Sequence, residues 1–204
     1  MAKLHFRYGA MNCGKTTILI QTAYNYEERG QKVIVIKPIA DTKGNDTIIN
    51  RIGLSRKVDE LIAPTDKIID KIDKHLEGLN CILVDEVQFL TEEQARELFL
   101  ISKVYDVAVI SYGLRTDFKG NLFEASAILL GLADSLEEMA TICRCGKKAR
   151  FNGRKVNNKF VSDGDVVVID NSQDNVEYES LCGECFTKKV LKKENNAVLK
   201  KGLI

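Results

Sequence analysis

The chain has 204 residues, a length that suits one domain of ordinary size or one domain with a small appendage. Its 30 lysine and arginine residues balance 29 aspartate and glutamate residues, so it lacks the overall basic field of a nucleic-acid binder. No apolar run is long enough to span a membrane, and the first residues do not resemble a signal peptide. We therefore expect a soluble, cytoplasmic protein that binds neither membranes nor nucleic acid, and whose six cysteines form no disulfides.

The first predicted elements are a strand, a glycine-rich loop and a helix. Lys3–Tyr8 alternates between apolar and polar residues as a strand does, and Thr17–Arg29 has the spacing of an amphipathic helix. Between them, GAMNCGKT matches the P-loop pattern G-x-x-x-x-G-K-[ST], in which backbone N–H groups and the helix N-terminus bind phosphate. Lys15 is expected to reach the β- and γ-phosphates, and the Thr16 hydroxyl to bind Mg²⁺. The predicted phosphate-binding residues are Gly9, Ala10, Met11, Asn12, Cys13, Gly14, Lys15, Thr16 and Thr17.

Apolar runs and amphipathic segments alternate along the following part of the chain. The predicted strands are Lys32–Lys37, which ends before Pro38, Cys81–Asp85, Val107–Ser111 and, with the weakest pattern, Ala140–Cys143. The predicted helices are Asp66–Leu79 and Thr91–Val104, the second beginning with a capping box of Thr91 and Gln94. Asp41–Asn50 is polar and lacks a period, so we expect a mobile loop there. This alternation predicts an α/β fold with a mostly parallel sheet flanked by helices.

Two acids end one of these predicted strands, in the sequence CILVDE from Cys81 to Glu86. In P-loop proteins an aspartate at such a strand end holds Mg²⁺, directly or through water, and Asp85 fits this role. Glu86 is the candidate general base, because a second carboxylate beside the metal is placed to accept a proton. Together with the P-loop, the pair favours ATP-dependent chemistry.

The composition changes after Ile142, where cysteine pairs, glycines and polar residues replace the alternation. Lys155–Ser162 and Asp165–Asp170 predict two short strands joined by a hairpin turn at Asp163-Gly164. Paired cysteines with this spacing are typical of a structural zinc site with four thiolates. The candidate ligands are Cys143, Cys145, Cys182 and Cys185. We therefore predict a P-loop domain at residues 1–142, a zinc-binding domain at 143–188 and a flexible basic tail at 189–204.

Taken together, these motifs resemble the thymidine kinase family of the cytosolic, tetrameric type, along nearly the whole chain. GAMNCGKT is similar to the family's P-loop, and DEVQF at Asp85–Phe89 to its DExQF. The stretch YGLRTDFKGNLF, Tyr112–Phe123, is similar to its G-L-x-x-x-F-x-x-x-x-F stretch, and DTK at Asp41 and RIG at Arg51 resemble its DTR and SRxG elements. The resemblance implies a RecA-like P-loop NTPase fold with a small C-terminal zinc-binding lasso domain.

The resemblance also implies the reaction, which is the phosphorylation of the 5′-hydroxyl of thymidine or deoxyuridine by ATP with Mg²⁺. Glu86 would accept the proton of that hydroxyl, and Asp41 and Arg51 would contact phosphate or the loop. The nucleoside-binding residues that it implies are Met11, Gln88, Leu114, Phe118, Phe123, Val168, Asp170 and Tyr178. It further implies a homotetramer that is inhibited by thymidine triphosphate as a feedback signal.

Other interpretations fit parts of the sequence. A P-loop ATPase coupled to nucleic acid would share the P-loop and use the cysteines in a zinc ribbon, but the near-neutral charge and the lack of interleaved aromatic and basic residues argue against it. A catalytically inactive nucleotide-binding scaffold would not need the intact Lys15, Asp85 and Glu86. A kinase for another small hydroxyl substrate stays open, because a P-loop determines the phosphate donor and not the acceptor.

Overall fold

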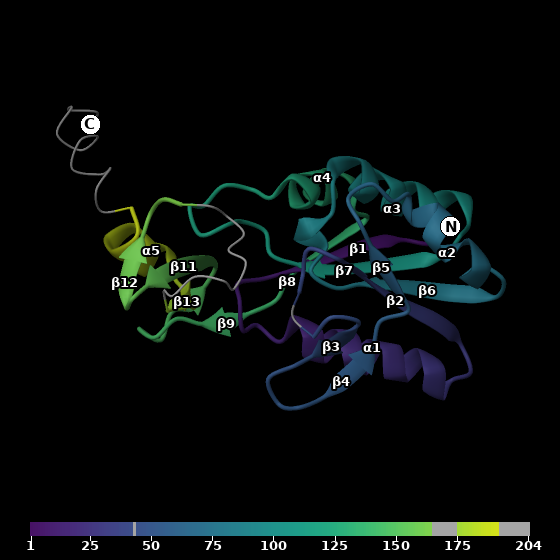
Figure 1. The fold of residues 1–204 in the computed structure, drawn as a ribbon, viewed down its shortest axis with the longest axis horizontal. Helices are drawn as coiled ribbons and strands as arrows, with labels where there is room; N and C mark the ends of the chain where they lie inside the picture. Colours follow the sequence, from purple (N-terminus) through teal and green to yellow (C-terminus); the bar gives the residue numbers. More distant parts are fainter. Residues whose placement is uncertain (43, 165–174, 192–204) are drawn as a thin grey trace. The chain divides into compact units, whose positions relative to one another are not determined.

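The structure, a computed structural model, describes residues 1–42, 44–164 and 175–191 (Figure 1). These residues form two compact units. The first unit contains residues 1–9, 14–115 and 123–139, and the second contains residues 10–13, 116–122 and the described residues from 140 on. The division into domains at residues 1–142, 143–188 and 189–204 stays a prediction, and residues 192–204 lie outside the described part.

A six-stranded sheet forms the centre of the first unit. Its strands run parallel, in the order β5-β2-β6-β7-β1-β8. They are β1 (Leu4–Tyr8), β2 (Lys32–Pro38), β5 (Glu60–Ile62), β6 (Leu79–Val84), β7 (Ala108–Gly113) and β8 (Ser135–Glu138). Strands buried on both faces are nearly continuous in apolar residues, and β6 shows this from Cys81 to Val84, all fully buried. The predicted fold class, a mostly parallel sheet flanked by helices, is confirmed.

Helices cover both faces of this sheet (Figure 1). The helix α1 (Lys15–Glu28) lies on one face, and α2 (Ile68–Ile72), α3 (Glu92–Val104) and α4 (Glu124–Leu132) lie on the other. Short 3₁₀ turns follow α2 at Asp73–His75 and β6 at Val87–Phe89. The predicted capping box is confirmed: the Thr91 side chain accepts from the Gln94 N–H, and the Gln94 side chain accepts from the Thr91 N–H. No helix in the described ranges is long and apolar enough to cross a membrane.

The predicted helix Asp66–Leu79 is wrong in both of its ends. The helix begins only at Ile68, where the Glu97 carboxylate accepts the backbone N–H groups of Ile68 and Ile69 at 2.8 and 2.9 Å. After Ile72 the chain tightens into a 3₁₀ turn, which ends the helical register early. The apolar spacing that suggested a long helix is therefore shared between a short helix and a turn.

Two other predictions for this part of the chain are corrected by the structure. Ala140–Cys143 does not add a fifth strand to the central sheet. That edge is β8, which pairs with β1, whereas β9 (Thr141–Ile142) pairs with β10 (Lys148–Ala149). Asp41–Asn50 is not simply a mobile loop, because β3 (Thr47–Ile49) forms an antiparallel hairpin with β4 (Ser55–Lys57). Asn50 holds the hairpin end: its side-chain oxygen accepts from Leu54 N at 2.8 Å, and its amide donates to Thr17 Oγ1 at 3.0 Å.

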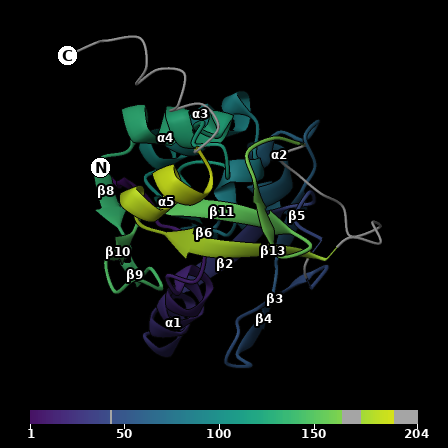
Figure 2. The same ribbon diagram turned by 90° about the vertical axis from the view of Figure 1, so that its left-hand side faces the viewer.

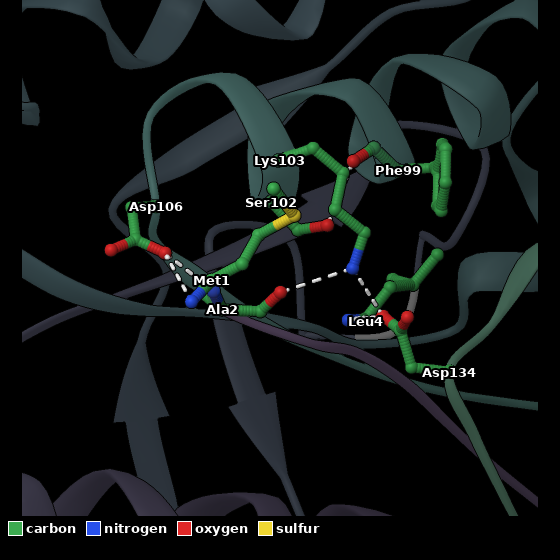
Figure 3. Close-up of polar contacts among 8 residues, drawn as sticks. All are labelled: Met1, Ala2, Leu4, Phe99, Ser102, Lys103, Asp106 and Asp134. Carbon is green, nitrogen blue, oxygen red and sulfur yellow. Dashed lines mark hydrogen bonds and ion pairs between the residues drawn. The ribbon is translucent and has the colours of Figure 1, made fainter.

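The start of β1 is held by a polar cluster at the amino ends of the parallel strands (Figure 3). The Lys103 ammonium, on α3, donates to the Ala2 carbonyl at 3.0 Å and forms an ion pair with Asp134. The same aspartate accepts from Leu4 N at 2.7 Å. Because the Lys103 ammonium and the Asp134 carboxylate both have partners within the cluster, they stabilise this end of the sheet.

The second unit is built on a three-stranded antiparallel sheet, with β11 (Phe151–Val156) between β12 (Lys159–Val161) and β13 (Val176–Leu181). The helix α5 (Gly183–Lys189) lies across β11 and β13 (Figure 2). The predicted strand Lys155–Ser162 is interrupted by a hairpin turn at Asn157-Asn158, with φ of 50° and 64°, which joins β11 to β12. Asparagine tolerates positive φ, which a two-residue hairpin turn requires. The predicted strand Asp165–Asp170 lies outside the described residues.

Candidate functional site

The P-loop connects β1 to α1 in the way that the motif predicts. Gly9 N donates to the Gly113 carbonyl at 3.3 Å, so the loop leaves the sheet beside the end of β7. Gly14 has a φ of 83°, a left-handed conformation that favours glycine, and α1 begins at the next residue. The Lys15 side chain is buried, with 7% of the residue exposed. The chain thus presents a helix N-terminus directly after a glycine turn, which is the arrangement that binds phosphate.

Asp85 lies at the carboxyl end of β6, where its backbone N–H donates to the Ile36 carbonyl of β2 at 3.0 Å. Its Oδ1 atom is buried and has no hydrogen-bond partner among the residues that the structure describes. Burial, and then the negative charges of Glu86 and Asp41, raise the pKa of Asp85 to about 7, while the Glu86 N–H and Lys15 oppose this shift. A buried carboxylate oxygen without a donor fits a site that is completed by a bound cation.

Glu86 follows in a left-handed backbone conformation, with a φ of 46°. Gln88 Nε2 donates to Glu86 Oε2 at 2.6 Å, and Gln88 Oε1 accepts from Leu114 N at 2.9 Å. The Gln88 side chain therefore bridges the end of β6 and the end of β7. Gly113 permits this approach, because a Cβ atom there would lie 2.6 Å from Gln88 Oε1 and 2.8 Å from Val87 Cγ1.

A buried lysine that the sequence analysis missed lies at the same edge of the sheet. Lys37, near the end of β2, is fully buried and forms an ion pair with Asp41 at 2.9 Å. Asp41 was predicted to contact phosphate or the loop, and its charge acts on Asp85. The signal in the sequence was a lysine inside an otherwise apolar strand, which is unusual unless the ammonium has a partner. Arg51, also predicted for this role, is exposed in the turn between β3 and β4.

The residues predicted to contact a nucleoside are divided between the two units. In the first, Phe123 immediately precedes α4 and meets Phe89 edge-on, with ring centroids 6.0 Å apart. In the second, Phe118 is buried under the guanidinium of Arg154, which lies 4.8 Å from the ring centroid. Tyr178 is half-buried on β13 and pairs in register with Arg154. Two further predicted residues, Val168 and Asp170, lie outside the described part of the chain.

The four predicted cysteine ligands come together in the second unit. Their sulfur atoms all lie within 4.8 Å of one another, and Cys145 Sγ is 3.5 Å from Cys182 Sγ. In a tetrahedral site with zinc–sulfur bonds of about 2.3 Å, the sulfur atoms lie about 3.8 Å apart, so this group can hold a metal ion. Burial raises the pKa of Cys143, but hydrogen bonds from the backbone N–H groups of Cys145 and Cys182 and from the Cys145 and Cys185 side chains together lower the pKa to about 6.

The fold and these residues define a P-loop protein with a second, cysteine-bearing unit. The family model described as "Thymidine kinase" matches residues 2–186. The "Thymidine kinase" of Mannheimia succiniciproducens is 42% identical over 199 residues, which cover 96% of this chain and 100% of that protein. That of Coxiella burnetii is 48% identical over 157 residues (76% and 80%), and that of Francisella tularensis subsp. tularensis 40% over 188 (89% and 95%). The chain belongs to the thymidine kinase family and is a kinase.

Proposed function

We propose that this protein transfers the γ-phosphoryl group of ATP to the 5′-hydroxyl of thymidine, and of deoxyuridine. The match of the family model to residues 2–186 is the observation that carries the identity of the acceptor. The geometry supports the reaction class, because the P-loop follows β1 and the two acids follow β6, two parallel strands of one sheet with β7 between them. Phosphoryl transfer depends mainly on positioning and on neutralisation of charge, and these are the roles that such residues can perform.

ATP is proposed to bind with Mg²⁺ along the P-loop. The ion neutralises charge on the β- and γ-phosphates when it is bound. Asp85 and the Thr16 hydroxyl would hold it, and the unpartnered, buried Oδ1 of Asp85 fits this role. Lys15 would bind the β- and γ-phosphates, and the residues from Gly9 to Thr17 would surround them. Asp41 and Arg51 are proposed as further contacts of the phosphates or the loop.

Glu86 is proposed as the general base that accepts the proton of the 5′-hydroxyl. Its Oε2 atom is already hydrogen-bonded to Gln88, which directs the carboxylate and leaves Oε1 to accept from the substrate. Gln88 is also proposed to contact the nucleoside substrate, beside Glu86. An apolar wall for the thymine ring is proposed from Met11, Leu114, Phe118 and Phe123, together with Val168, Asp170 and Tyr178.

The bridge by Gln88 can be tested without changing Glu86 or Gln88. In Gly113→Ala, the new methyl group would push Gln88 Oε1 away and disturb the orientation of Glu86. We expect kcat to fall by about tenfold to a hundredfold, the size of effect that a small misplacement of a reacting group has. Gly131→Ala on α4 is the matched control, because nothing lies within 4 Å of the added Cβ, and its kcat should equal the parental value. Steady-state kinetics on both variants decide, and a parental kcat for Gly113→Ala would contradict this role.

We further propose that the cysteine cluster holds a structural zinc ion. Cys145→Ser should reduce the zinc content, measured by plasma mass spectrometry, from one equivalent per chain to a small fraction of it. Because structural zinc contributes binding energy directly to folding, the variant should also lose its compact second unit, seen as a lower Tm and faster proteolysis. Cys81→Ser is the control, since Cys81 lies in β6 outside the cluster and its replacement should leave the zinc content unchanged. A parental zinc content in Cys145→Ser would exclude this cysteine as a ligand.

Three further properties are proposed from the family resemblance. Thymidine triphosphate carries both a phosphate chain and a thymine ring, so it would engage both parts of the proposed site and inhibit by feedback. The assembly is proposed to be a homotetramer, and the location the cytoplasm. Size-exclusion chromatography with light scattering would test the homotetramer, and titration of thymidine triphosphate into the kinase assay would test the inhibition.

The proposed acceptor is tested by incubating the protein with MgATP and each of the four natural deoxynucleosides. We expect thymidine monophosphate to form, and deoxyuridine to react as an analogue in a fifth reaction. Deoxycytidine should be rejected, because a site whose polar groups match the hydrogen-bonding edge of thymine would leave those groups unpaired against cytosine. ATP hydrolysis that responds to single-stranded DNA and not to thymidine would instead support the nucleic-acid-coupled ATPase.

A further inference from the structure

The middle of the P-loop belongs to the second unit. Residues 10–13 group with the cysteine-bearing part of the chain, although Gly9 and the residues from Gly14 on belong to the first unit. Met11 N donates to Asn152 Oδ1 at 2.7 Å, and Ser180 Oγ donates to the Met11 carbonyl at 2.5 Å. Side chains of the second unit therefore hydrogen-bond both the backbone N–H and the backbone carbonyl of Met11.

The two side chains that hold Met11 lie at one point of the small sheet. Asn152 on β11 and Ser180 on β13 are paired in register, and both are buried, with 4% and 7% exposed. A third contact follows one residue later, where Thr141 Oγ1 donates to the Asn12 carbonyl at 3.2 Å. Asn12 itself is in a left-handed conformation, with a φ of 65°, which asparagine adopts more readily than most other non-glycine residues.

We propose that Asn152, Ser180 and Thr141 are positioning residues for ATP, which fix the shape of residues 10–13 so that the loop is preorganised for phosphate. This inference rests on the proposed function of the P-loop in binding ATP. The N–H of Met11 is directed to Asn152 and not to phosphate, so Met11 contributes to phosphate binding by its conformation alone. The unit that carries the cysteine cluster thereby contributes to the affinity for the phosphate donor.

The test measures the affinity for the non-hydrolysable analogue AMPPNP with Mg²⁺, by calorimetry and without any nucleoside. Ser180→Ala removes one hydrogen bond with little change of volume, and it should weaken AMPPNP binding by about threefold to tenfold. Ser180→Thr keeps the hydroxyl and should restore the affinity to within about twofold of the parent. Ser102→Ala is the matched control, because Ser102 is also buried and donates to a backbone carbonyl, that of Phe99 at 2.7 Å (Figure 3). It should lower Tm and leave AMPPNP affinity unchanged.

A Ser180→Ala protein that loses Tm as Ser102→Ala does, but binds AMPPNP as the parent does, would overturn the proposal. If Ser180→Ala does not fold, Thr141→Val decides, since it removes the hydroxyl at a half-buried position and keeps the shape of the side chain. It should weaken AMPPNP binding by about twofold to fivefold, and an unchanged affinity would overturn the proposal as well. A parent that binds AMPPNP but does not phosphorylate thymidine would contradict the proposed function alone, so the two failures are distinguishable.

Discussion

Replacement of Glu86 by glutamine should lower kcat for thymidine by about 10²-fold to 10⁴-fold, the contribution that a positioned general base makes. Glutamine has the same shape and can accept the hydrogen bond from Gln88, now held at 2.6 Å by the carboxylate. What it cannot do is take a proton from the 5′-hydroxyl. The loss should therefore be in kcat, with binding of AMPPNP and of thymidine within about threefold of the parent.

Glu93→Gln is the matched control for this variant. Glu93 is an exposed glutamate in the first turn of α3, so the same chemical change there should leave kcat unaltered. Rapid-mixing experiments with a single turnover separate chemistry from product release. If Glu86→Gln phosphorylates thymidine at the parental rate, Glu86 is not the base, and the proton must leave by way of water or of the phosphate itself.

Asp85→Asn should affect activity and stability in opposite directions. The substitution removes the carboxylate that is proposed to hold Mg²⁺, so kcat with MgATP should fall by about 10²-fold or more. In the ligand-free protein, however, the same carboxylate is buried and its Oδ1 lacks a hydrogen-bond donor in the described structure. Asparagine is neutral and nearly the same size as aspartate. The free energy of unfolding of the Asp85→Asn protein at pH 8 should therefore be higher than that of the parent, by about 2 kcal/mol.

The dependence of this gain on pH follows from the raised pKa of Asp85, about 7 in the folded protein. Above pH 7 the folded parent carries a buried charge, whereas the unfolded chain carries it in water. As the pH falls through 7 toward the ordinary pKa of aspartate, the folded state takes up a proton that the unfolded state does not, and the parent gains stability. The advantage of Asp85→Asn should thus be largest at pH 8 and shrink toward pH 5. Urea denaturation without Mg²⁺ measures it, and a variant less stable than the parent at pH 8 would contradict this account.

Features that depend on neighbouring residues in the chain could be predicted from the sequence. Examples are the P-loop between a strand and a helix, the capping box at Thr91 and Gln94, and the succession of the apolar strand β6 and the amphipathic helix α3. The paired cysteines also come together, although only one residue separates Cys143 from Cys145. The site residues proposed for nucleoside and phosphate stay predictions, because they were taken from motif and resemblance and not from a bound ligand.

Apart from the cysteine cluster, features that depend on residues far apart in the chain could not be predicted. β8 is short and polar, and it is a strand only because the edge of β1 accepts it in register. The bridge from Gln88 to Leu114 exists because β6 and β7 pair and Gly113 has no side chain. The turn at Asn157-Asn158 inside the predicted strand Lys155–Ser162 was missed, because it is set by the pairing of β11 with β12 and Asn-Asn is a weaker turn signal than Asp-Gly.

The proposed reaction requires that one protein binds ATP and thymidine and transfers the phosphoryl group between them. The most direct measurement uses ATP labelled in its γ-phosphate, with Mg²⁺ and thymidine, and counts the label in thymidine monophosphate against the ADP formed. We expect one labelled thymidine 5′-monophosphate for each ADP, with neither product formed by Glu86→Gln above about 1% of the parental rate. ADP that accumulates with the label in free phosphate, and none in thymidine monophosphate, would contradict it.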